Sequence, residues 1–416
     1  MPKKNLFSSL GIPSKKFLIV FVLLFNSFIW FFMNLFILST ALKNANVNNL
    51  LAWTVYLIAI VGSSLLGALV TPRLSRSALI YAWLLLGIFT SFLLSALTIN
   101  VSFEYLLIII LFSGIAFGLG MPSTLAYFAE VTIFENRGHI GGIIFFVTNL
   151  SIAACALFLE TDLAIDSYVA AIWRIIGLAI IFLLRPIEEG KEQRKAVPFR
   201  SVLSNRAFVL FLVPWFMFCL IDRFELQIFL NSPNLGASLG ALSLLIEPIV
   251  GTVFALVGGF LADWIGRKKV VVSGFVALGV AYAVLGVAAE TLFAQYFFIL
   301  IDGIAWGIFF VLFLLILWGD LSSTVVGKEK YYAVGSIPFF IAYLMQYLIK
   351  PYIDSIQVGA FEVSFSFASL FLFIAVLPLI YAPETLPEKK IQEMQIKKYV
   401  KEAKKVLEKE TGKKNA

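Results

Sequence analysis

The sequence predicts an all-α polytopic membrane protein with twelve transmembrane helices arranged as two six-helix bundles. Its 416 residues are 61% hydrophobic and only 14% charged, whereas soluble domains average roughly 45–50% apolar and about 25% charged residues. The apolar residues fall in blocks of about 20, which as helices cross roughly 30 Å of hydrocarbon. Most charged residues lie in the short segments between these blocks. One soluble core could not bury so much apolar surface.

Twelve blocks are long enough to cross the membrane as helices. The first follows the basic start MPKK, but it is too long for the apolar region of a signal peptide, and no small-residue cleavage site follows it. We therefore expect it to be retained as a helix. The expected spans are 17–40, 50–71, 77–98, 105–128, 139–159, 166–184, 207–230, 238–262, 270–289, 293–318, 332–350 and 361–382.

The positive charges support this number of crossings. Alternate loops lie on the same side of a membrane, and lysine and arginine collect on the cytoplasmic side. On the side of the N-terminus lie 28 of the 32 lysines and arginines, and the loops of the other side hold only Lys43 and Lys350. We therefore expect a multi-pass protein of the cell membrane with both termini in the cytoplasm.

The longest internal polar stretch, RPIEEGKEQRKAVPFRSVLSNR, separates six blocks from six. It predicts an N-terminal bundle over 1–184, a cytoplasmic linker over 185–206 and a C-terminal bundle over 207–382, followed by a charged tail helix over 383–416. The halves share a weak repeat at an offset of about 190 residues, because GALVTPRLSR aligns with GFLADWIGRK. Such a repeat is typical of transporters built from two related bundles.

Several functions are excluded by what the sequence lacks. One histidine and two cysteines are too few for a disulfide framework or a His/Cys metal site. No phosphate-binding loop of the P-loop type occurs, which excludes ATP as the direct energy source. An enzyme would need a nucleophile with a base, and His139 has no cysteine beside it. We expect neither enzymatic activity nor a cofactor, and no nucleic-acid partner.

Residues 258–269, GGFLADWIGRKK, resemble the cytoplasmic signature of the major facilitator superfamily, in which a glycine and an acid precede a second glycine and a basic run. The matching residues are Gly259, Asp263, Gly266, Arg267 and Lys268. Small residues such as Gly259 let helices approach closely, and Asp263 is suited to accept hydrogen bonds from a neighbouring helix N-terminus. The resemblance implies a latch that holds the two halves in the outward-facing state.

Two further stretches resemble sugar-porter-like or metabolite-symporter-like members of that family. Glu130 and Arg137 follow the fourth helix as an acid-to-arginine element, and APETLPEKK ends the twelfth. In the first-half loop, however, Thr71 stands in place of the acid and Leu74 in place of the glycine. The resemblance therefore implies a latch that depends on the second copy. The resemblance implies a prokaryotic or archaeal source, and the lysine- and glutamate-rich tail and the scarcity of cysteine favour a thermophile.

Six charged residues fall inside the apolar blocks, where each costs about 2.5–3.5 kcal/mol at mid-membrane and so needs a reason. They are Arg174, Asp222, Arg223, Glu225, Glu247 and Asp302. Counted at 1.5 Å per residue, all lie in one layer roughly 7–14 Å below the external surface. Arg223 points about 100° away from Asp222 on an ideal helix, so its expected partner is Glu247, Asp302 or a substrate.

Two of the four acids are left without an obvious cationic partner. Burial favours the neutral form of a carboxyl group, so such residues can carry a proton or bind a cation. Glu247 is the preferred coupling residue, because the following Pro248 frees a backbone carbonyl and permits a kink. The alternative is structural: Arg174 and Arg223 neutralise two acids, and Glu225 reaches the external headgroups.

Uncharged polar residues supply further candidates for substrate binding. Asn26, Trp30 and Asn34 lie near one stripe of the first helix, and Asn149 lies in the fifth. Trp306 and Gln346 are candidates from the tenth and eleventh helices. Core packing and hydrogen bonds between helices are the alternative roles for all six.

These observations predict a secondary active transporter that moves a small organic solute by alternating access, coupled to protons or another ion, and acting as a monomer in the bilayer. The alternatives are an efflux protein for drugs or organic cations, and a non-transporting membrane scaffold, sensor or lipid-handling protein. The excess of acids favours a neutral or cationic solute over an anion. Substrate identity and direction of transport stay open.

Overall fold

The computed structural model describes residues 13–45, 49–71, 73–96, 102–156, 159, 162–185, 197–231, 241–322, 327–353, 361–387 and 396. These residues are helical with short connections and include no strand. Twelve segments among them are long and apolar enough to cross a membrane. The predicted all-α, twelve-helix fold class is therefore confirmed.

The N-terminal half contains six crossings. Its helices are α1 (Ser14–Ala45), α2 (Asn49–Val70), α3 (Arg76–Ser95), α4 (Phe103–Gly118), α5 (Met121–Val131), α6 (Arg137–Ala156) and α7 (Leu163–Leu184). α4 and α5 together make the fourth crossing. The crossing is broken near Pro122 because proline lacks the backbone N–H that would continue a helix and fits best in a first turn. The sequence predicted one unbroken helix here.

The C-terminal half contains the other six crossings. Its helices are α8 (Phe199–Leu203), α9 (Arg206–Asn231), α11 (Ala241–Ile265), α12 (Arg267–Ala288), α13 (Leu292–Phe310), η3 (Val311–Ile316), α14 (Leu317–Leu321), α15 (Lys328–Ile353) and α16 (Phe361–Tyr381). The tenth crossing runs through α13, the π-helical η3 and α14. The short α8 lies within the predicted linker. Half of that linker (186–196) and most of the predicted tail helix (388–395 and 397–416) lie outside the described residues.

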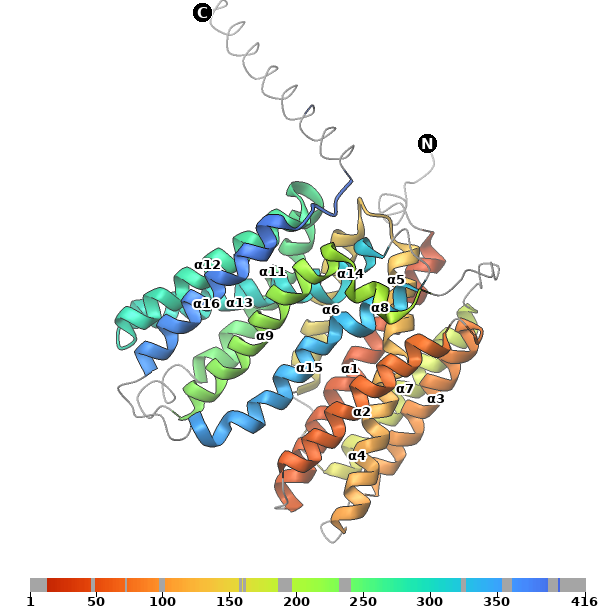
Figure 1. Cartoon of the computed structure of the whole chain (residues 1–416). Helices are drawn as coiled ribbons and strands as arrows, with labels where there is room; N and C mark the ends of the chain where they lie inside the picture. The colour runs from red at the N-terminus through yellow and green to blue at the C-terminus, as the bar shows by residue number, and fades with distance from the viewer. Residues whose placement is uncertain are drawn as a thin grey trace, which may run out of the picture.

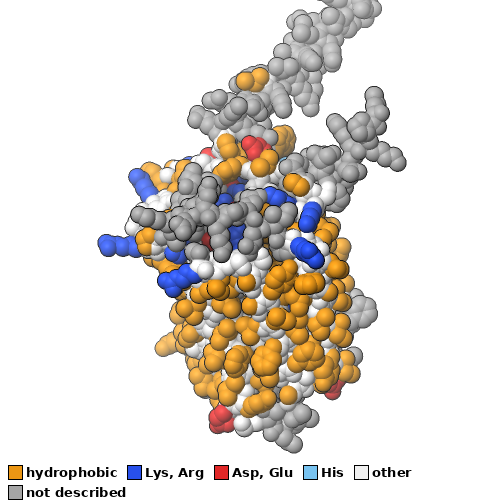
Figure 2. Space-filling view, turned by 90° about the vertical axis from the view of Figure 1, so that its right-hand side faces the viewer, with side chains coloured by type: hydrophobic (Ala, Val, Ile, Leu, Met, Phe, Trp, Pro, Cys, Tyr) orange, Lys and Arg blue, Asp and Glu red, His pale blue; other side chains and the backbone are white. Residues whose placement is uncertain are grey.

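The two halves lie side by side, and α1 begins at the end of the molecule where α16 finishes (Figure 1). The halves meet where α6 packs against α11 and α2 packs against α15. Hydrophobic side chains cover the middle of the molecule, and lysines and arginines gather at the end where α1 begins and α16 finishes (Figure 2). We call this end, at which α3, α6 and α12 begin, the basic face. Twelve apolar crossings with such a belt make the chain a multi-pass membrane protein.

Candidate functional site

A cavity of about 230 Å³ lies between the two halves. It is lined by helices of both halves, among them α1, α2, α6 and α15, and eight of its lining residues are phenylalanines. Its few polar groups include Thr148 and Asn149 on α6 and Ser336 on α15. The Thr148 hydroxyl is buried without a hydrogen-bond partner. The cavity is thus an aromatic chamber with a small number of polar positions, as ligand sites commonly are.

A charged pair lies directly behind the aromatic wall of this cavity. Phe310 and Phe339 line both the cavity and the space around Asp222 and Arg223. Arg223 Nε donates to Asp222 Oδ2 over 2.6 Å, and Arg223 Nη2 lies 2.5 Å from the same oxygen. Trp306 Nε1 donates to Asp222 Oδ1. The pair is therefore neutral and well hydrogen-bonded.

This pairing corrects the expectation that Arg223 reaches across to another helix. The 100° between neighbouring residues separates their Cβ directions, but it does not limit where a long side chain ends. The guanidinium of Arg223 folds back onto its neighbour and lies 4.5 Å from the centre of the Tyr343 ring. Cation–π contact supports this position.

Three acids remain, and the fold brings them together. Glu225 on α9, Glu247 on α11 and Asp302 on α13 place carboxylate oxygens within 4.8 Å of one another. We call these residues the acidic triad. Glu225 and Glu247 are each six residues from a helix end, about 9 Å along the axis. In the described part of the chain, no lysine or arginine forms an ion pair with the triad.

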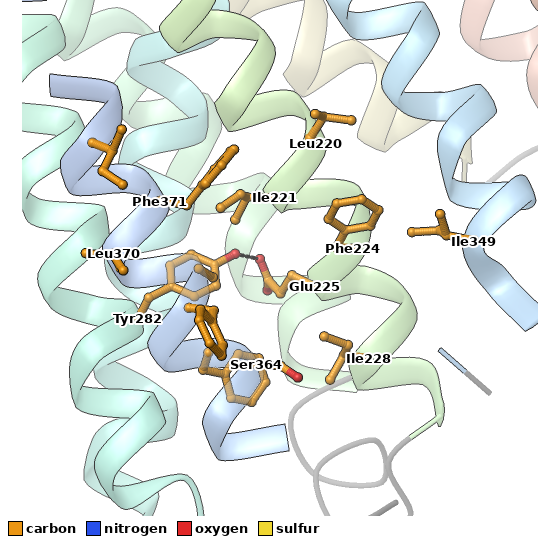
Figure 3. A pocket seen from close by; sticks show the side chains of 14 residues that line it. Leu220, Ile221, Phe224, Glu225, Ile228, Tyr282, Ile349, Ser364, Leu370 and Phe371 are labelled. Carbon is orange, nitrogen blue, oxygen red and sulfur yellow. Dashed lines mark hydrogen bonds between the residues drawn. The ribbon is translucent and has the colours of Figure 1, made fainter. Parts of the chain in front are cut away.

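One interpretation of the sequence placed the Glu225 side chain at the external headgroups. The structure shows it buried instead. The side chain is 7% exposed and accepts a hydrogen bond from the Tyr282 hydroxyl on α12. Both residues line a second, largely apolar cavity of about 490 Å³ between α9, α12, α15 and α16 (Figure 3). Tyr282 was not predicted from the sequence, because a tyrosine in an apolar helix carries no signal of its partner.

The polar stripe of α1 lies away from the central cavity. Asn26 donates to the Trp173 carbonyl oxygen over 2.7 Å, and Trp30 donates to Ser91 Oγ over 2.8 Å. Asn34 donates to the Trp30 carbonyl oxygen of its own helix. None of the three stripe residues lines the cavity, so these contacts pack α1 against α7 and α3. Of the uncharged candidates, Asn149 does line it, whereas Gln346 does not.

Arg174 on α7 anchors the same packing. It is fully buried, and its Nη1 donates to Asn26 Oδ1 and Ser27 Oγ over 2.9 and 2.8 Å. Its guanidinium carbon lies 4.7 Å from the ring centre of Trp30 and 4.4 Å from that of Trp83. Two aromatic faces and two neutral acceptors take the place of a counter-ion here.

Replacing Arg174 by alanine should therefore destabilise the protein without a specific effect on the central cavity. Loss of a large buried side chain costs about 2–5 kcal/mol, so we expect the purified variant to unfold at least ~5 °C below wild type. Thermal unfolding measured by intrinsic fluorescence checks this. Arg174→Lys, which keeps the charge but not the planar fork, should fall between the two. An unchanged unfolding temperature in Arg174→Ala would contradict the anchoring role.

At the basic face, Asp263 joins the two halves. Its carboxylate accepts hydrogen bonds from the backbone N–H groups of Gly138 and His139, over 3.0 and 2.7 Å. These groups begin α6 in the other half, so the acid caps a foreign helix N-terminus, as the sequence predicts. The approach is close, because a Cβ on Gly259 would collide with the carbonyl oxygen of Gly138.

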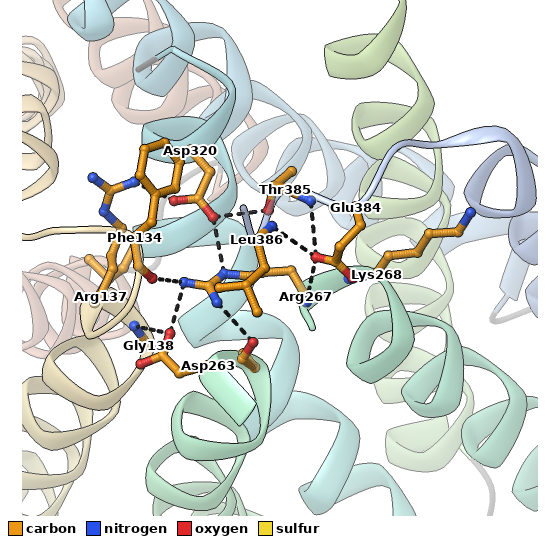
Figure 4. Close-up of polar contacts among 12 residues, drawn as sticks. Phe134, Arg137, Gly138, Asp263, Arg267, Lys268, Asp320, Glu384, Thr385 and Leu386 are labelled. Atoms are coloured by element: carbon orange, nitrogen blue, oxygen red, sulfur yellow. Dashed lines mark hydrogen bonds and ion pairs between the residues drawn. The ribbon is translucent and has the colours of Figure 1, made fainter. Parts of the chain in front are cut away.

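Asp320 is the centre of a second set of contacts at this face (Figure 4). It is 4% exposed and accepts from Arg137 Nη1, from Arg267 Nε over 3.1 Å and from Thr385 Oγ1 over 2.9 Å. Arg137 begins α6, so this acid also bridges the halves. Asp320 was not predicted from the sequence, although the repeat offset of about 190 residues places it opposite Glu130.

The segment after α16 is tied to the same place. Glu384 Oε1 accepts from the backbone N–H of Arg267 over 2.8 Å, and its Oε2 accepts from that of Lys268 over 3.2 Å. The carboxylate therefore caps the N-terminus of α12, immediately after Gly266, whose φ of 104° suits glycine.

The first half retains an ion pair across the interface despite its altered loop. Thr71 bonds only within its own helix, to the Gly67 carbonyl oxygen. Arg76 Nη2 lies 3.1 Å from Glu130 Oε1 and 2.8 Å from Glu329 Oε1, and Glu329 belongs to the other half. The pair of Arg76 and Glu130 is thus the counterpart of Arg267 and Asp320 in the repeat.

Solved structures share this fold at low sequence identity. The human organic anion transporter MFSD10 (TETRAN) is 15% identical, matching 88% of this chain and 100% of its own with a TM-score of 0.64. The proton:xylose symporter XylE, bound to 6-bromo-6-deoxy-D-glucose, is 15% identical over 89% of this chain and 97% of its own, with a TM-score of 0.65. The Escherichia coli fucose:proton symporter FucP is 11% identical over 88% of this chain and 98% of its own, with a TM-score of 0.65.

No curated protein sequence matches the chain. The family model described as Major Facilitator Superfamily matches residues 17–330, which is most of the sequence. This match covers the signature at 258–269 and nearly all of the N-terminal half. The chain therefore belongs to the Major Facilitator Superfamily, and is a transporter rather than an enzyme.

Proposed function

We propose that this protein is a secondary active transporter that moves a small organic solute through the central cavity by alternating access, coupled to protons through Glu247. The main support for this proposal is the cavity itself, because both halves line it. Residues of both halves also hold the basic face together. Rocking of the halves would then expose the cavity to each side in turn. One chain supplies the whole cavity, so a monomer suffices.

The lining of the cavity favours an apolar solute over a sugar. A sugar carries many hydroxyl groups, each of which needs a hydrogen-bond partner when it leaves water. Eight phenylalanines and a few polar groups cannot supply so many partners. Aromatic rings do attract organic cations, and the acidic triad is not far behind the wall. Efflux of a lipophilic organic cation is accordingly the second candidate function.

The basic face is proposed to be cytoplasmic, following the positive-inside rule. With that face closed, the cavity is shut off from the cytoplasm. We expect a membrane-impermeant maleimide applied to intact cells to label Glu290→Cys, at the exposed opposite face, and to spare Lys269→Cys, exposed at the basic face. Both variants are made after replacing the free Cys155 and Cys219. The reverse pattern would refute this orientation.

Purified protein screened by thermal shift against neutral and cationic apolar solutes should identify candidate substrates. Each candidate is then tested in proteoliposomes for counterflow exchange and for uptake driven by a pH gradient. Substrate-stimulated proton movement is the expected result. A ligand that binds but never crosses the membrane would support the scaffold alternative and contradict transport. Asn149→Ala, which removes a polar group from the lining, should weaken binding of a true cavity ligand.

A further inference from the structure

The acidic triad is an incomplete set of charges. Glu225, Glu247 and Asp302 come from three different helices, yet their carboxylate oxygens lie within 4.8 Å of one another. The nearest buried cation, Arg223, is already bound by Asp222 through two of its nitrogens. Three carboxylates so close together in a water-poor interior repel one another unless they take up protons or a positive charge joins them.

Two groups at the triad lack the partners that buried polar atoms normally have. Glu247 Oε1 is buried without a hydrogen bond. Ser243, one turn earlier on α11, is 9% exposed, and its hydroxyl adjoins the Glu247 carboxyl but has no partner outside the triad. Asp302 is 2% exposed, and no hydrogen bond or ion pair reaches it from the described residues. These oxygens are therefore available to an added ligand.

The donor set and its size indicate the kind of ligand. All donors are oxygens and the group contains no histidine or cysteine, a set that suits hard cations rather than zinc or copper. Three oxygens within 4.8 Å of one another leave a point no more than about 2.8 Å from each, close to the roughly 2.3–2.6 Å that calcium prefers. Magnesium needs about 2.0–2.1 Å and keeps most of its water, so it fits less well.

We propose that Glu225, Glu247 and Asp302, with the Ser243 hydroxyl, bind one hard divalent cation of the size of calcium. Two positive charges balance three carboxylates better than the single charge of sodium does. Tyr282 holds Glu225 in place by donating to it, as groups behind a metal ligand commonly do. The cation links α9, α11 and α13. The role of this site in transport rests on the proposed function. In that role, the cation and a proton on Glu247 would occupy the site in turn.

Calcium binding to the purified full-length protein tests this directly. After treatment with a chelator, equilibrium dialysis with radioactive calcium at constant ionic strength should give one bound ion per chain. Calcium should also raise the unfolding temperature, because a ligand that binds only the folded state stabilises it. No saturable calcium binding to the wild type, or saturation by sodium with no effect of calcium, would overturn the proposal.

Substitutions locate the ion. Glu247→Gln and Asp302→Asn should each weaken calcium binding at least roughly tenfold, as loss of a charged ligand does, whereas Glu247→Asp, which keeps the charge, should weaken it less. Glu290→Gln, which removes an exposed acid of the same face, is the matched control and should bind like wild type. Binding that survives all the triad substitutions would place the ion elsewhere and refute the site.

Separate assays distinguish this proposal from the proposed function. Calcium binding that depends on the triad, in a protein that shows no solute counterflow, would uphold the cation site and refute transport. Solute counterflow in a protein that binds no calcium would do the opposite.

Discussion

Replacing Glu247 by glutamine is expected to abolish solute accumulation driven by a pH gradient and to leave solute exchange intact. Glutamine has nearly the same shape but cannot take up or release a proton, so movement of the halves would no longer be linked to the gradient. Gradient-driven uptake into proteoliposomes should fall to the level of empty liposomes. Counterflow exchange of the same solute, which needs no gradient, should stay close to wild type.

The two assays separate coupling from stability. If Glu247 were only structural, the unfolding temperature would fall and both activities would decline together. Glu290→Gln should leave both unchanged, because that acid is exposed and is not a member of the triad. Full gradient-driven uptake by Glu247→Gln would contradict the assignment and move it to Asp302.

Replacing Asp320 by asparagine should open the basic face. Asp320 accepts from Arg137 and Arg267, which are themselves 2% and 0% exposed. Removing one partner of a buried ion pair costs about 3–5 kcal/mol, enough to shift a balanced two-state equilibrium by more than roughly 100-fold. A cysteine at Leu314, which lines the cavity, should then react faster with an impermeant maleimide supplied from the basic face of inside-out vesicles.

Two companion variants calibrate this result. Asp263→Asn should act in the same direction with a smaller effect, about 1.5–3 kcal/mol, since it weakens charge-assisted hydrogen bonds and leaves one arginine, Arg267, short of a partner rather than two. Asp162→Asn should have no effect, because Asp162 caps α7 at the opposite face and asparagine caps equally well. Equal labelling of Leu314→Cys in all backgrounds would mean that these contacts do not hold the face closed.

The fold was predictable because the membrane imposes its dimensions on the sequence. Helices about 20 residues long and apolar, separated by basic loops, leave little choice of architecture. The breaks in the fourth and tenth crossings were not predictable, since the hydropathy of a segment depends on its side chains and not on its backbone hydrogen bonds. Pro122 was visible as a possible break, but the π-helical turns of η3 depend on packing that no local pattern encodes.

Many residues of the candidate site were predictable, but their contacts were predictable only where a residue acts on backbone. Asp263 was expected to cap a helix, and it does. Side chains that depend on tertiary neighbours were harder: Arg223 folds onto Asp222, and Asn26 binds Arg174 instead of lining the cavity. A polar residue in an apolar helix shows that a partner exists, but not which one. The convergence of three carboxylates from separate helices was likewise invisible in the sequence.

Distances between spin labels on the two halves test alternating access most directly. One pair, at Arg73 and Lys269, spans the basic face, and the other, at Leu50 and Tyr352, spans the opposite face; all four side chains are exposed. We predict that Asp320→Asn lengthens the first distance and shortens the second in double electron–electron resonance, because the halves rock about the cavity between them. Distances that stay fixed, or that lengthen at both faces together, would contradict alternating access.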